Sequence, residues 1–82
     1  MIYEITVSHC GIEAKKVQRA RLDAARLLYA REVHSAAGYL GKLDTIQGVE
    51  AVKDAENAAF DRANGSAHIT VIGPYTISLV QL

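Results

Sequence analysis

The stretch that decides the fold is residues 67–82, AHITVIGPYTISLVQL. It holds two runs rich in Ile, Val, Thr and Tyr, the residue types that favour strands, and the Gly73–Pro74 dipeptide separates them. In the second run Tyr75, Ile77 and Leu79 alternate with other side chains, so they share one face. We predict two strands, over 67–72 and 75–82, joined by a turn.

A third strand and two helices are predicted upstream of this stretch. Residues 2–8 have near period-2 alternation and read as a half-buried strand. Residues 12–38 contain no Pro and are rich in Ala, Leu, Arg and Lys, which predicts a long helix. A second helix is predicted over 46–63, with Thr45 or Asp44 as its N-cap and Asn64–Gly65 as its end.

These elements predict one compact α+β domain over residues 1–82, in the order β-α-α-β-β. Two helices would pack on one face of a small antiparallel three-stranded sheet. The other face would carry polar side chains that suit solvent or a polar partner: Glu4, Thr6, His68, Thr70, Thr76 and Ser78. The predicted first helix has two apolar stripes. The second stripe, which includes Tyr29, Val33, Ala37 and Leu40, could pair two copies of the chain as a homodimer.

Composition narrows the classes of protein further. The 82 residues include nine basic and nine acidic side chains, so bulk attraction to nucleic acid is not indicated and direct DNA binding is not expected. The single cysteine excludes an intrachain disulfide. No apolar run approaches the ~20 residues that span a bilayer, and the N-terminus lacks the pattern of a signal peptide. We therefore expect a cytoplasmic protein that does not bind membranes.

The zero net charge is the sum of two opposite segments. Residues 13–31 carry six basic and two acidic side chains, a net of +4, and residues 44–62 carry two basic and five acidic ones, a net of −3. Along the predicted first helix, a basic face is formed by Lys15, Lys16, Arg19 and Arg26. We predict that these four contact carboxylates or phosphates of a partner. A solvated face paired with the acidic second helix is the alternative.

Cys10 is the one candidate nucleophile, and it precedes the predicted helix, where a thiol pKa can be lowered. A small thiol enzyme would use Cys10 with His9 or His34. A structural role in a loop is the favoured interpretation, because no signature of a cysteine enzyme surrounds it. The sequence also lacks Cys or His residues paired at the short spacing typical of metal sites, and it lacks a phosphate-binding glycine loop. We therefore predict no metal and no cofactor.

The C-terminal third carries a resemblance. The Ala-rich stretch DAENAAF at 54–60 leads through NGS at 64–66 into HITVIG at 68–73 and a last strand. With its size and its opening strand, the chain resembles small phage-encoded inhibitors of type I CRISPR surveillance complexes (anti-CRISPRs). The resemblance implies a non-catalytic protein that binds a larger protein or ribonucleoprotein complex stoichiometrically in the host bacterial cell. The neutral charge departs from acidic members that mimic DNA, which favours occlusion of a protein or guide-RNA surface. A structural homodimer and a thiol enzyme remain the alternatives.

Overall fold

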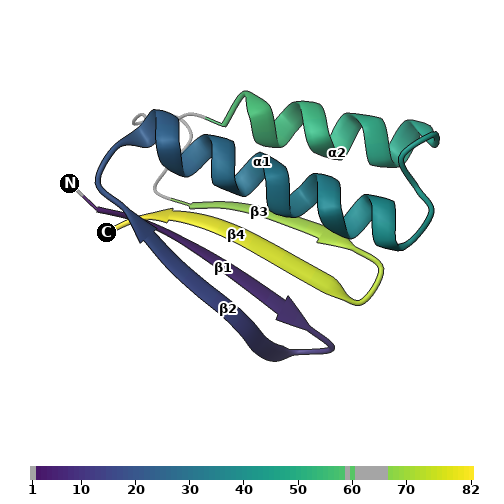
Figure 1. Cartoon of the computed structure of the whole chain (residues 1–82), viewed down its shortest axis with the longest axis horizontal. Coiled ribbons are helices and arrows are strands. Elements are labelled where there is room, and N and C mark those ends of the chain that lie inside the picture. The colour runs from purple at the N-terminus through teal and green to yellow at the C-terminus, as the bar shows by residue number, and fades with distance from the viewer. Residues whose placement is uncertain (1, 59, 61–66) are drawn as a thin grey trace.

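The computed structural model describes residues 2–58, 60 and 67–82. In this part of the chain, two helices cover one face of a four-stranded antiparallel sheet (Figure 1). The sheet has the strand order β2-β1-β4-β3, and it is confirmed that the fold is α+β. The elements along the chain are β1 (Tyr3–His9), β2 (Ile12–Arg19), α1 (Leu22–Tyr39), α2 (Ile46–Glu56), β3 (Ala67–Ile72) and β4 (Tyr75–Gln81).

The prediction of three strands in the order β-α-α-β-β is wrong, because residues 12–19 form β2 and not the start of a helix. Cys10 and Gly11 have φ values of 52° and 81°, and positive φ at both central residues is what a type I′ hairpin turn requires. The turn folds β2 back along β1, from His9 opposite Ile12 to Tyr3 opposite Arg19. Pairing with β1 thus overrides the helix propensity of the Ala, Lys and Gln side chains in β2.

The helices are shorter than predicted. α1 begins at Leu22, after the hairpin, and ends at Tyr39. α2 begins at Ile46 as predicted, because the Thr45 hydroxyl accepts a hydrogen bond from the Gly48 N–H at 3.1 Å. It ends at Glu56, where Asn57 donates from its side chain to the Lys53 carbonyl at 2.8 Å. The predicted stop at 64–65 lies outside the described residues.

The core lies between α1 and the two central strands. Ile5 of β1, with Ile77 and Leu79 of β4, is at most 1% exposed. The second apolar stripe of α1 covers them, with Tyr29, Val33 and Ala37 buried and Leu40 packed beside them. These four side chains were the candidate contacts of a homodimer. They belong to the core instead, because the sheet of the same chain takes up that stripe.

The helix-free face of the sheet is less polar than predicted. On β3, Ile69 and Val71 are 66% and 62% exposed, whereas the adjacent residues His68 and Thr70 are half-buried. The register explains this, since Ile72 is buried with the core and the alternation of a strand places His68 and Thr70 on the same side as Ile72. The assignment of His68 and Thr70 to the open face is therefore wrong.

The two edges of the sheet differ in charge. β2 is exposed and carries Lys15, Lys16 and Arg19, and charged side chains on an edge strand discourage pairing with other chains. β3, at the opposite edge, contains no Lys, Arg, Asp or Glu. The edge at β3 is therefore the one open to another strand.

Among the described residues, neither helix combines the length and the hydropathy that a membrane span needs.

Gly48 fixes the start of α2, which gives a test of the fold. A Cβ at this position would collide with the carbonyl oxygen of Lys42. We expect Gly48→Ala to lower the free energy of unfolding by about 1–3 kcal/mol, despite the better helix propensity of Ala. Urea unfolding measures the effect.

Gly38→Ala in α1 is the matched control. The nearest atom to its Cβ would be Leu43 Cδ1 at 3.2 Å, at the end of a side chain that can move. We expect a change below about 1 kcal/mol. Equal unfolding midpoints for the two variants would contradict the close approach of α2 to residue 42.

Candidate binding groove between α2 and β3

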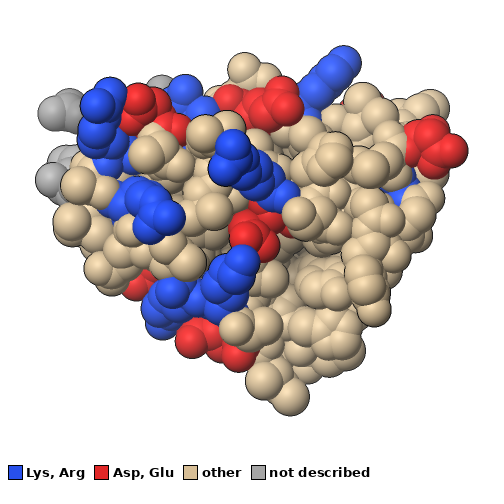
Figure 2. Space-filling model, in the orientation of Figure 1, with Lys and Arg blue, Asp and Glu red and all other residues tan. Residues whose placement is uncertain are grey.

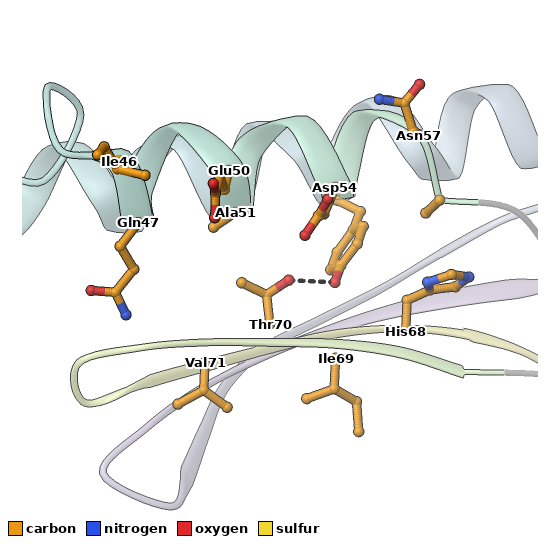
Figure 3. A pocket seen from close by; sticks show the side chains of 12 residues that line it. Ile46, Gln47, Glu50, Ala51, Asp54, Asn57, His68, Ile69, Thr70 and Val71 are labelled. Atoms are coloured by element: carbon orange, nitrogen blue, oxygen red, sulfur yellow. Dashed lines mark hydrogen bonds between the residues drawn. The ribbon is translucent and has the colours of Figure 1, made fainter. Parts of the chain in front are cut away.

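A groove of about 920 Å³ lies between α2 and the edge strand β3 (Figure 3). α2 contributes Gln47, Glu50 and Asp54 to its wall, and β3 contributes His68 and Thr70. In Figure 3, Gln47 and Asp54 extend from the helix toward the strand, whereas Ile69 and Val71 extend away from the helix. The groove therefore has a polar interior and an apolar margin below it.

The groove exists because α2 packs on α1 through small residues. In α2, all of whose residues are described, only Gly48 and Ala55 are buried. The large side chain of Ile46 is 79% exposed, and Ala51 above β3 is too small to fill the space. A helix with larger residues on this side would close the groove onto the sheet.

Tyr29 of α1 fixes β3 beneath the groove. Its hydroxyl lies 2.7 Å from the Thr70 Oγ1, and the dashed line in Figure 3 marks this hydrogen bond. Burial raises the pKa of Tyr29 above its usual 10.0; the Thr70 bond lowers it and the Asp54 charge raises it again. The hydroxyl is thus neutral near pH 7 and holds β3 at a fixed position relative to α1.

The end of α2 is held by Arg26. Its Nε donates to the Ala58 carbonyl oxygen at 2.6 Å across a partly buried contact. A charged donor makes this hydrogen bond stronger than a neutral one. Arg26 therefore ties the segment after α2 to α1, and so sets the wall of the groove.

The groove is acidic. Glu50 and Asp54 lie one helical turn apart on α2, and both are exposed. Among the described residues, neither forms an ion pair, and no Lys or Arg lines the groove. Like charges at this spacing repel by a few tenths of a kcal/mol, so a cation placed near both is favoured.

The predicted basic face does not form. Lys15, Lys16 and Arg19 lie on β2, at the edge of the sheet opposite the groove, and Arg26 lies on α1. Because a strand alternates sides, Lys15 and Arg19 share the face of Val7 and Tyr3, and Lys16 shares the face of Thr6. The prediction of one helical arc was wrong because it used a helical period for a strand.

The basic side chains of β2 have local partners. Lys15 pairs with Glu32 of α1 at 2.7 Å, and Lys16 pairs with Glu13 at 3.1 Å and Glu4 at 3.8 Å. The hydrogen bond to Glu13, and then the charges of Glu13 and Glu4, raise the pKa of Lys16. Figure 2 shows Lys and Arg side chains interleaved with Asp and Glu over β2 and α1. A partner-binding role for these side chains stays a prediction.

Cys10 sits in the hairpin turn with an exposed side chain. Its N–H donates to the Pro74 carbonyl at 2.9 Å and so joins the two turns at one end of the sheet. The ring of His9 lies against Tyr75, with centroids 4.8 Å apart. His34 lies on α1, away from this turn in the chain, and among the described residues no three His, Cys, Asp or Glu side chains lie close enough to hold a metal ion.

Sequence reasoning missed Glu50, Asp54 and Thr70 as site residues. The negative segment 44–62 was noted, but its carboxylates entered only the alternative interpretation, as partners of the basic residues. The alternation counted back from Ile72 was the signal that could have placed Thr70 beside α2.

The chain was also compared with known protein families, with curated proteins and with solved structures, and none of the three comparisons finds a match.

Tyr29→Phe tests the fixation of β3. We expect the free energy of unfolding to fall by about 0.5–1.5 kcal/mol at pH 7, because the hydrogen bond to Thr70 is lost. Since the folded-state pKa of Tyr29 is raised, the unfolded chain loses this proton first, and wild-type stability declines as pH rises above about 10. The variant should show a shallower decline in urea unfolding between pH 8 and 11.

Tyr39→Phe is the control, since Tyr39 is 81% exposed. It should leave both the stability at pH 7 and its alkaline decline close to wild type. If Tyr29→Phe behaves like this control, Tyr29 does not hold β3.

Arg26→Met tests whether Arg26 is structural. The substitution keeps a long side chain but leaves the Ala58 carbonyl without its charged donor, so we expect a loss of about 1.5–3 kcal/mol in urea unfolding. Arg31→Met, at an exposed position of the same helix, should change stability by less than about 0.5 kcal/mol. An unchanged stability for Arg26→Met would return Arg26 to the residues available for a partner.

Proposed function

We propose that this protein is a non-catalytic binding module that holds a segment of a partner protein in the groove between α2 and β3. The observation that supports it is the coincidence of an uncharged edge strand with an acidic groove of about 920 Å³ above it. This volume lies at the upper end of the ~300–1,000 Å³ of ligand clefts. An edge strand under a helix is also a recurring surface for peptide recognition.

The resemblance to phage-encoded inhibitors names a candidate partner within this function. We propose a type I CRISPR surveillance complex as the target, bound stoichiometrically in a bacterial cell. Two surfaces are available for such an association: the groove at the β3 edge, and the basic side chains at the β2 edge. The groove is the better-supported surface, because the basic side chains of β2 already contact Glu32, Glu13, Glu4 and the Gln18 carbonyl.

Selection from a displayed library of random 12-residue peptides tests the binding module. The wild-type chain and the groove-filling variant Gln47→Trp serve as baits, since Gln47 is exposed and extends into the groove. We expect peptides that bind wild type and lose at least about tenfold in affinity for the variant. Val49→Trp adds the same ring elsewhere on α2 and should leave binding unchanged.

Peptides that bind wild type and Gln47→Trp equally would contradict a role for the groove.

For the named target, purified type I surveillance complexes are titrated with the protein, and loss of their DNA binding should saturate near one equivalent per binding site. Loss at far below one equivalent, growing with time, would indicate catalysis and overturn the proposed function. A target unaffected by excess protein would overturn the CRISPR assignment alone.

A further inference from the structure

We infer that the groove takes an extended peptide segment that adds beside β3 as a fifth strand, with basic and apolar side chains in alternation. The inference rests on the proposed function and specifies the chemistry of the partner segment. Three features of the described residues support it: the open edge of β3, the two carboxylates above it, and the two apolar side chains below it.

The backbone of β3 supplies the first feature. In the described sheet, β3 pairs with β4 on one side only, so the N–H and C=O groups on its other side lack a strand partner. An added strand would lie about 4.8 Å from β3, beneath the open side of α2. Main-chain hydrogen bonds would give this complex affinity for extended segments in general, and side chains would give it specificity.

Glu50 and Asp54 determine which side chains fit into the groove. They are four residues apart on α2, so they are separated by about 6 Å along the helix axis. In Figure 3, α2 runs along β3, and alternate residues of a strand that follows β3 recur every ~6.7 Å. Two Lys or Arg side chains at positions i and i+2 of the segment therefore match the two carboxylates in both charge and spacing.

Ile69 and Val71 determine the side chains at the positions in between. They are also two residues apart, they lie on the helix-free face, and they are 66% and 62% exposed. In an added strand, every second side chain points to that face. Apolar side chains there would cover Ile69 and Val71, which favours a segment such as Lys-Val-Lys-Val over a uniformly basic one.

A second copy of this chain fits the groove less well. A β3–β3 pair would bring a second α2, with its own Glu50 and Asp54, close to the first, and like charges disfavour that approach. The charged edge strand of a second copy, β2, has the apolar Val17 between Lys15 and Arg19 on its helix-facing side. Basic residues at i and i+2 on that side are therefore not available from β2.

Direct binding of short fluorescent peptides tests the inference. The probe is (Lys-Val)₄, compared with (Glu-Val)₄ and with Lys₄Val₄, which has the same composition without alternation. We expect (Lys-Val)₄ to bind at least about tenfold more tightly than Lys₄Val₄ in fluorescence anisotropy, and (Glu-Val)₄ not to bind. Hydrogen exchange should show new protection of the amides of Ile69 and Val71, which point away from β4.

Charge-neutral variants test the carboxylates. We expect Glu50→Gln with Asp54→Asn to weaken (Lys-Val)₄ binding at least about tenfold, with unchanged thermal stability. Asp44→Asn with Glu56→Gln removes the same charge outside the groove and should leave affinity within about twofold. Equal losses in the two double variants would show non-specific charge attraction and overturn the inference.

Three outcomes overturn the inference in different ways. Equal affinity for (Lys-Val)₄ and Lys₄Val₄ would exclude a preference for alternating basic and apolar side chains. A dimer in light scattering, with the amides of Ile69 and Val71 protected before peptide is added, would make a second copy the occupant. Library peptides that depend on the groove but lack alternating basic residues would overturn the partner chemistry and leave the proposed function standing.

Discussion

The packing of α1 on β1 and β4 is the interaction on which the rest of the structure depends. Ala25, Val33 and Ala37 are fully buried there, against Ile5, Ile77 and Leu79. Each large aliphatic side chain buried in this way contributes about 1.5–3 kcal/mol, and the two alanines let the helix approach the sheet. Because α1 occupies the centre of the sheet, α2 lies to one side, above the edge strand β3 (Figure 1).

This placement makes the two sides of the molecule unequal. Toward β2, the sheet ends in basic side chains that pair with Glu32, Glu13 and Glu4. Toward β3, it ends in an uncharged strand beneath the carboxylates of α2. The molecule, whose net charge is zero, therefore has a basic edge that is largely neutralised by local ion pairs. It also has an acidic groove, whose carboxylates form no ion pair among the described residues. An interaction surface is better supported at the second edge than at the first.

The predictable part of the fold is the part with strong local signals. The strands around Gly73–Pro74 and the first strand were predicted within about a residue, and so was the start of α2 after Thr45. β2 was not predictable in the same way, because its residues form helices well and only the turn at Cys10–Gly11 reverses the chain. This one error changed the strand count and removed the basic helical face. The groove escaped prediction because it depends on how far α2 stands from β3.

By itself, the sequence determined the α+β class, the neutral charge, its division into basic and acidic segments, and the β-type C-terminal third. These follow from composition and periodicity, which are local properties of a chain. Only the tertiary structure decided which charges meet and which strand stays at the edge. Lys15 meets Glu32, and Tyr29 meets Thr70, across 17 and 41 residues of chain. Contacts at such separations depend on how α1 lies on the sheet, and no pattern within a single element contains that information.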